Sequence, residues 1–475
     1  MGDVKYEPSS HKPADRQYFV LTHAGKPVFT VRKQEEVDTG SDEVTNLIGV
    51  MHALISVFED DQDKIRSIVA PPVRITFTIR PPLYYVCVAP SNEPESVARI
   101  YLEHLHLLIL SVLTGSQLER ILTRHTNFDL RRLLSGTTTM LQTHLLHLPT
   151  SFAILTSSLN TLRLDANLRL RAADALVPPP NMKSKLKDIL YAMVVVDDRV
   201  VTIARPKKHT VHPADIHVLL ATIGSPAVKG NTASWLPICL PKFNPNSLLH
   251  AYASYLTLPD TAVPSQPAST RQEESTEGGE APADNEEGAT GEVHEPSVCL
   301  VIVSASGDFE VVRQWADVAT QRLNEADTLK HLIKAGQKSA YSVDELGIPG
   351  LRHFFYKSRA NVQVTAPAFE GIESLGKEGE MDQIDREEEW DRLLALYRLV
   401  WDAIHAKSGQ ECTLKLQYVR TERVSVMGWI TQSFEIYIAL SPRLPKSAAV
   451  GAANAVVKWM KQEESRLFLK DAPVF

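Results

Sequence analysis

A repeated order of local patterns constrains the fold of this 475-residue chain more than any other feature. The stretch YFVLTHAGKPVFT (18–30) has two β-branched and aromatic runs on either side of a Gly25-Lys26 turn, which predicts a hairpin. Comparable hairpins are predicted at 190–206 and 352–369. Three copies of one pattern indicate a repeated module.

Each predicted hairpin is followed by the same succession of elements. A buried strand runs into a polar break and then a long amphipathic helix at 82–110, 297–323 and 433–460. Between hairpin and closing helix lie further strands and a first helix, at 43–60, 212–223 and 388–407. Ser and Asp residues in the polar breaks are expected to cap the closing helices. Each copy is therefore predicted to be an α+β domain, with an antiparallel sheet flanked by helices.

These patterns divide the chain into three domains with connecting segments. We expect a disordered tail (1–16), a first domain (17–135), a helical connector (136–185), a second domain (186–340) and a third domain (341–475). The stretch 259–297 is rich in Glu, Gly, Pro and Ser, so it is predicted to be a disordered insert in the second domain. A second acidic stretch, 370–389, is predicted to be a solvated loop leading into a helix.

Composition excludes several classes of protein. A net charge of -7 argues against nucleic acid as a partner. The chain has no run of about 18 apolar residues and no N-terminal signal pattern, so neither a spanning helix nor secretion is expected. Cys87, Cys239, Cys299 and Cys412 each lie in an apolar stretch, as buried reduced thiols do. The predicted location is cytosolic, peripheral to a membrane.

The sequence contains none of the common motifs for covalent catalysis. Walker A, H-E-x-x-H, C-x-x-C and G-x-S-x-G patterns are absent from the sequence, and Pro27 removes a donor that a phosphate loop needs. His104 and His106 are two apart on a helix and cannot face one ligand. His144 and His147 permit a metal by spacing, but a core or surface pair is the favoured interpretation. We therefore predict no catalytic residue, no cofactor and no metal, with an enzyme using a cryptic site as a remote alternative.

The first helix, 43–59, is apolar on two sides. One stripe, here called the wide stripe, suits a sheet and comprises Val44, Leu47, Ile48, Met51, Leu54, Ile55 and Phe58. An adjacent narrow stripe comprises Asn46, Val50, Ala53 and Val57. Together they span roughly 220°, well over the 100° that a one-sided surface helix needs. Such a helix is either wedged inside a larger fold or presented to a partner.

Several stretches together resemble one family of proteins. They include YFVLTHAGKPVFT, LIGVMHALISVF, PPLYYVCVAPSNEPES, SVLTGSQLERIL, PICLPKFNP, FFYKSRANVQVTAPAF and LKLQYVRTERVSVMGWITQSFEIYIAL. Their order and combination, from about residue 17 to the end of the chain, resemble the Mon-one ("monensin sensitivity") family of vacuolar fusion proteins. The resemblance implies three longin domains, each an antiparallel five-stranded sheet flanked by helices.

The same resemblance implies a function. Family members pair with a Ccz-type tri-longin subunit to form a guanine-nucleotide exchange factor for Rab-seven-type GTPases. They act on late endosomes, multivesicular bodies, vacuoles and autophagosomes, and their first longin domain forms the GTPase platform. Exchange then proceeds by displacing switch I and disturbing the magnesium site, without covalent chemistry. We accordingly expect the narrow stripe to contact the GTPase or the partner longin domain.

Two further expectations concern membranes and an alternative role. Basic stretches at 181–189 and 205–209 are candidate contacts for phosphoinositide or other acidic lipid through Lys183, Lys185, Lys187, Arg205, Lys207 and Lys208. An upstream endosomal Rab is a further candidate partner. The alternative function is a non-catalytic longin adaptor, tethering or coat subunit in vesicle trafficking.

Overall fold

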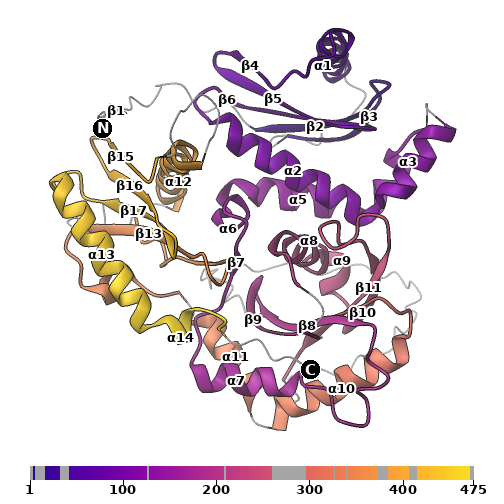
Figure 1. The fold of residues 1–475 in the computed structure, drawn as a ribbon, viewed down its shortest axis with the longest axis vertical. Coiled ribbons are helices and arrows are strands. Elements are labelled where there is room, and N and C mark those ends of the chain that lie inside the picture. Colours follow the sequence, from indigo (N-terminus) through magenta and orange to yellow (C-terminus); the bar gives the residue numbers. More distant parts are fainter. Residues whose placement is uncertain are drawn as a thin grey trace, which may run out of the picture.

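Three sheets surround a shared centre of helices (Figure 1). The computed structural model describes residues 4–5, 16–32, 42–125, 128–207, 210–258, 296–325, 327–338, 340–371, 383–405 and 414–470. Each sheet contains five antiparallel strands with helices on its faces, which confirms the predicted α+β class and the triplication.

The first domain has a five-stranded sheet of order β3-β2-β6-β5-β4. Its strands are β2 (Gln17–Thr22), β3 (Pro27–Val31), β4 (Ser67–Ala70), β5 (Val73–Arg80) and β6 (Leu83–Pro90), and its helices are α1 (Asp42–Asp60) and α2 (Glu95–Val112). Successive residues of a strand point to opposite faces. Phe19 and Leu21 therefore pack with α1, whereas Tyr18 and Val20 pack in the core that contains α2.

The second domain has a five-stranded sheet of order β10-β11-β12-β8-β9. Its strands are β8 (Ile189–Val196), β9 (Arg199–Ala204), β10 (Ala233–Ile238), β11 (Leu249–Leu256) and β12 (Val298–Ser304). Its helices are α8 (Pro213–Ile223), α9 (Pro226–Lys229), α10 (Phe309–Glu325) and α11 (Thr328–Gln337). Asp197 and Asp198 both have positive φ in the β8–β9 turn, at 44° and 61°, as a two-residue hairpin turn requires.

The third domain contributes five antiparallel strands to a larger sheet of order β1-β15-β16-β17-β13-β14-β7. These strands are β13 (Leu351–Ser358), β14 (Gln363–Thr365), β15 (Leu416–Arg420), β16 (Ser425–Ile430) and β17 (Phe434–Leu440). The helices are α12 (Gln383–His405), α13 (Lys446–Gln462) and α14 (Glu464–Leu467), after a 3₁₀ turn at Val343–Leu346. Two short parallel strands, β1 (Val4–Lys5) and β7 (Leu159–Asn160), extend the sheet at its two edges.

The connector between the first and second domains is mixed rather than only helical. It contains α5 (Thr138–His147), α6 (Phe152–Leu155), β7 and α7 (Ala166–Ala175), with a 3₁₀ turn at Leu148–Thr150. Helices α3 (Gly115–Arg124) and α4 (Arg131–Leu134) and a 3₁₀ turn at Ser135–Thr137 precede these elements, at the end of the first domain. The buried Arg169 of α7 donates to the carbonyl oxygens of Leu162, Val201 and Arg466 at 2.7, 2.7 and 2.8 Å. One guanidinium thus ties the connector to the second and third domains.

The three domains share one interior. The largest apolar core contains buried residues of α2, α8 and α12, together with α5 and α6 of the connector. Phe152 of α6 stacks on Phe355 of β13 with ring centroids 4.1 Å apart, which joins the connector to the third sheet. Helices α2, α5, α6 and α8 lie between the sheets in Figure 1. The three domains therefore pack against one another through their inner helices and share one hydrophobic core.

Several local expectations need correction. Pro94 and Pro445 precede α2 and α13, and neither helix has a side-chain cap, although Asp308 does bond the Val311 N–H at the start of α10. Helix α12 begins at Gln383, within the predicted acidic loop 370–389. Ser297, at the end of the predicted insert, bonds Asp197.

Other expectations fall outside the part of the chain that the structure describes. These are most of the tail, residues 259–295 of the insert, 372–382 of the acidic loop, and Cys412. The other three cysteines, Cys87, Cys239 and Cys299, are free and buried.

Candidate functional site

Helix α1 has one face in the core and one face in solvent. Val44, Ile48, Met51 and Ile55 of the wide stripe are buried against β2, β5 and β6. Leu47 and Leu54 are partly buried at the same core. Phe58 departs from the prediction, because 37% of its surface is exposed at the end of the helix.

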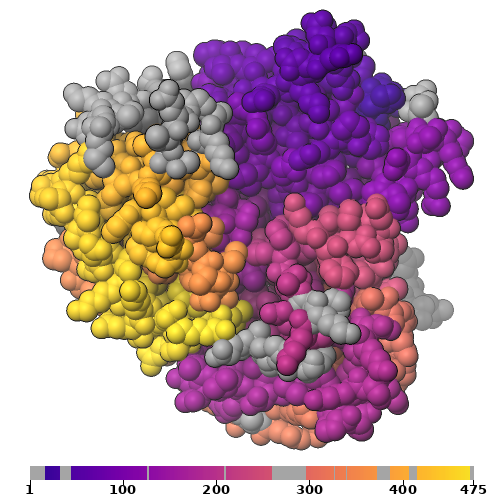
Figure 2. Space-filling view, in the orientation of Figure 1, coloured from indigo at the N-terminus to yellow at the C-terminus, as the bar shows by residue number. Residues whose placement is uncertain are grey.

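The narrow stripe lies on the outer side of α1. Asn46, Val50, Ala53 and Val57 are all exposed, with 57% of Val50 and 60% of Val57 accessible to solvent. Figure 2 shows this part of the chain at the rim of the molecule. The sequence carries no charged residue between Glu43 and Glu59, so an uncharged strip runs along the helix between two acidic ends. Exposed aliphatic side chains in such a strip are suited to burial against a protein.

Two contacts fix α1 to its sheet. His52 Nε2 lies 3.1 Å from the carbonyl oxygen of His23 in the β2–β3 turn. Gly25 of this turn has φ of +75°, and a Cβ there would lie 2.9 Å from the His52 ring. The glycine of the opening AGKP motif thus allows the turn and the close approach of α1. At the other end, Tyr84 donates to the Glu59 carboxylate at 2.8 Å, and burial together with this carboxylate raises the pKa of Tyr84.

The repeat gives α1 a direct comparison within the chain. Helices α8 and α12 occupy the position of α1 in the second and third modules, directly after the hairpin. Both of these helices pack into the shared interior, where α8 contacts α2 and α5, and α12 contacts α2. In the first module the arrangement is reversed, since the closing helix α2 faces the interior and α1 faces outward. The helix that follows the hairpin is therefore packed in the interior in two modules and lies on the outside in one.

The candidate lipid contacts gather at one end of the second sheet. Lys183, Lys185 and Lys187 are exposed just before β8, and Lys207 is exposed just after β9, with Arg205 half-buried. Because β8 and β9 are antiparallel, with Ala192 opposite Ala204, these two stretches lie at the same end of the sheet. Lys208 lies outside the described residues.

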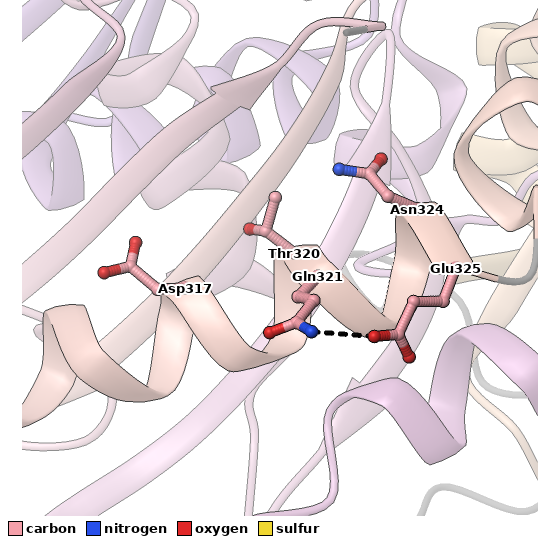
Figure 3. Close-up of a pocket in the computed structure, with 5 residues that line it drawn as sticks. All are labelled: Asp317, Thr320, Gln321, Asn324 and Glu325. Atoms are coloured by element: carbon pink, nitrogen blue, oxygen red, sulfur yellow. Dashed lines mark hydrogen bonds between the residues drawn. The ribbon is translucent and has the colours of Figure 1, made fainter.

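Within the described ranges, the geometry offers little for covalent catalysis. An open concavity is lined by Asp317, Thr320, Gln321, Asn324 and Glu325, all from the single helix α10 (Figure 3). Gln321 donates to Glu325 at 2.7 Å, and the lining includes no nucleophile paired with a base. Among the described residues, no group of three or more His, Cys, Asp or Glu side chains is arranged to hold a metal ion.

The histidine contacts in the structure are not those suggested by sequence spacing. His106 Nδ1 contacts the Tyr85 hydroxyl at 2.9 Å, while His104 faces His144 from another helix. His147 is exposed and takes no part in that pair. Sequence reasoning missed the His104–His144 contact because it joins residues forty positions apart on different helices.

In the described ranges, no single helix is both long and apolar enough to cross a bilayer. Helices α2 and α3 reach that threshold only as a pair, with an 81° bend between them.

Comparisons with known proteins identify the repeated module. Models of the first, second and third longin domains of FUZ, MON1 and HPS1 match residues 16–144, 187–318 and 350–464. The vacuolar fusion protein MON1 of Cryptococcus neoformans var. neoformans serotype D is 42% identical over 461 residues, covering 97% of this chain and 65% of that relative. The chain thus spans 65% of the length of this fungal relative.

Vertebrate relatives extend the match. Vacuolar fusion protein MON1 homolog A of Gallus gallus is 31% identical over 455 residues, covering 96% of this chain and 72% of the relative. Protein SAND of Takifugu rubripes is 30% identical over 455 residues, covering 96% of this chain and 76% of the relative. With three matched longin domains in the same order, the chain belongs to the MON1 family.

Proposed function

We propose that this chain is a subunit of a heterodimeric guanine-nucleotide exchange factor that promotes GDP release from a Rab-seven-type GTPase. Its partner is a second tri-longin subunit of the Ccz type. The name vacuolar fusion protein, carried by relatives from fungi and vertebrates, supports a role in membrane fusion and endosomal maturation. The proposed sites of action are late endosomes, multivesicular bodies, vacuoles and autophagosomes.

Such a factor works through differential binding. It binds the nucleotide-free GTPase more tightly than the nucleotide-bound form, and it displaces switch I and disturbs the magnesium site. A thousand-fold acceleration needs about 4 kcal/mol of preference for the nucleotide-free state. Burial of an exposed aliphatic side chain contributes about 1 kcal/mol, so a strip of a few such residues is of the required order where that burial is made with the nucleotide-free GTPase alone.

One observation carries the proposal. The helices equivalent to α1 pack into the shared interior of the chain, whereas the narrow stripe of α1 is exposed. An uncharged helical face of this kind is what a second longin domain or a GTPase switch region needs for docking. We therefore assign Asn46, Val50, Ala53 and Val57 to contact with one of these two proteins.

We assign membrane attachment to a separate surface. The exposed lysines before β8 and after β9 lie at one end of the sheet, which supports a contact with phosphoinositide or other acidic lipid. An upstream endosomal Rab completes the proposed set of partners and recruits the complex to its membrane.

The test is release of a fluorescent nucleotide from a prenyl-free Rab-seven-type GTPase. The chain alone, the chain with the Ccz-type subunit, and the pair carrying Val50→Asp with Val57→Asp are compared. A matched control is Leu170→Asp, because Leu170 is 54% exposed on helix α7 of the connector. Both substitutions lie at exposed helical positions, so the melting temperature of the free chain should change little.

The outcomes separate the alternatives. Acceleration by the intact pair, lost in the double variant while the subunits still co-purify, assigns the narrow stripe to the GTPase. Dissociation of the variant pair assigns it to the subunit interface instead. Absence of acceleration in every combination refutes exchange activity and leaves the adaptor role.

A further inference from the structure

Three imidazole rings meet where the first and second domains join. His104 lies on α2, His144 on α5 and His217 on α8. The ring centroid of His104 is 5.1 Å from that of His144 and 6.5 Å from that of His217. His104 and His217 are buried, and His144 is half-buried. Each ring comes from a different helix of the α2–α5–α8 contact.

Hydrogen bonds restrict the protons that this cluster can hold. The Nε2 atoms of His104 and His144 are 2.9 Å apart, so one donates and the other accepts. Nε2 of His217 lies 2.7 Å from the carbonyl oxygen of Ser158, which can only accept, so this nitrogen carries hydrogen. One extra proton on the His104–His144 pair would create a buried imidazolium cation. A second extra proton would direct the two Nε2–H groups at each other, with no acceptor between them.

No carboxylate acts on these rings among the described residues. The groups that act electrostatically on His104 are His144 and His217, and those that act on His144 are His217 and His147. Burial is the main cause that lowers the pKa of all three rings, with that of His144 lowered to about 4. For His217 the bond to the Ser158 carbonyl opposes this effect only in part.

Acidic side chains on the same helices have other partners. Glu95 and Glu103 of α2 are paired with Arg99 and Arg80. Asp215 of α8 accepts the backbone N–H groups of Lys242 and Phe243, both at 2.9 Å. Helix α5 has no acidic residue between Thr138 and His147. A cation formed in the cluster would therefore be buried without a counter-ion, which is costly.

We propose that His104, His144 and His217 form a proton-sensitive latch between the first and second domains. The closed junction keeps the three rings neutral, and opening of the α2–α8 contact lets them take up protons. Acidification therefore favours the open junction and loosens the domain that carries α1 from the second domain. This latch does not depend on the proposed exchange activity.

The size of the effect follows from linkage. In the open junction each imidazole has an ordinary pKa of about 6.5, whereas in the closed junction it stays neutral. Between pH 7.5 and pH 6.0, each ring then raises the open fraction about four-fold, and three rings together raise it about 50-fold.

Hydrogen exchange of the α2 and α8 amides in the full chain measures this opening, after correction for the pH dependence of intrinsic exchange. Wild type should gain about 50-fold between the two pH values, but His104→Gln with His144→Gln only about four-fold. The glutamines can bond each other but do not titrate. His331→Gln, exposed on α11 and not among the groups that act on the three rings, should behave as wild type. A double variant with the full pH dependence of wild type overturns the proposal.

A second measurement needs no substitution. The imidazole C2–H resonances of wild type are titrated by NMR alongside hydrogen exchange. The latch requires that the rings take up protons only as protection of α2 and α8 is lost. Titration near pH 6.5 with protection unchanged overturns the proposal, even where the double variant does not fold.

Discussion

Replacing Arg169 should uncouple the connector from the domains it joins. Arg169→Met keeps much of the side-chain volume but removes the donors to Leu162, Val201 and Arg466. Three buried carbonyl oxygens are then left without this partner. Burial already lowers the pKa of the guanidinium to about 10, yet it remains a cation at neutral pH.

The magnitude follows from these three bonds. Each hydrogen bond to a charged group contributes about 1.5–3 kcal/mol when one partner is removed. The variant also regains part of the cost of burying a cation, so the net loss is smaller than the sum. We expect the free energy of unfolding to fall by about 3–5 kcal/mol, with Arg169→Lys intermediate because one ammonium cannot reach all three carbonyls.

Equilibrium urea unfolding of the full chain, followed by tryptophan fluorescence, measures the loss. Arg120→Met is the control, since Arg120 is exposed on helix α3 and should change stability by no more than about 0.5 kcal/mol. A loss below about 1 kcal/mol for Arg169→Met would refute the reasoning, because the carbonyls would then be satisfied without the guanidinium.

Two further predictions concern packing and pH. A Cβ at Gly428 would lie 2.5 Å from Val400 Cγ1 and 2.7 Å from Ile404 Cδ1, so Gly428→Ala should lower stability to urea by about 1–3 kcal/mol. A Cβ at Gly451 on α13 would have no atom within 4 Å, so Gly451→Ala should raise stability to urea by about 0.5–1 kcal/mol. If the two substitutions changed stability equally, the packing argument would be contradicted. Burial lowers the pKa of His353 to about 3, so the unfolded chain takes up this proton first as pH falls below about 6.5. The free energy of unfolding then falls by about 1.4 kcal/mol per pH unit down to the folded pKa. His353→Gln should remove this loss when the free energy of unfolding is measured across pH. If wild type and variant lose stability in parallel as pH falls, His353 is not the cause.

The repeated modules and the two apolar sides of α1 could be predicted from the sequence alone. Alternating runs around Gly25 and Asp197-Asp198 predicted hairpins, because the side-chain period and turn residues are local properties. The wheel of α1 separated the buried wide stripe from the exposed narrow stripe, with Phe58 as the exception at the helix end. Contact of the narrow stripe with a partner stays a prediction.

Long-range arrangement was beyond local patterns. The reversal of the first module, with α2 inward and α1 outward, depends on how modules pack and leaves no mark in the period of either helix. The capping prediction failed at Pro94 and Pro445, where proline fixes the backbone at the helix start without a side-chain acceptor. The His104–His144 contact and strand β7 likewise arise only when distant segments meet.

The hydrogen bonds of the connector also determine when this segment can fold during synthesis of the chain. Thr161 Oγ1 donates to the carbonyl of Leu467, and Arg169 donates to that of Arg466, across separations of 306 and 297 residues. Domains emerge from the ribosome in sequence, so the connector waits for almost the whole chain before its native partners exist. During that interval its buried apolar residues need other protection. Nascent chains stalled before the third domain should therefore be the form that chaperones bind.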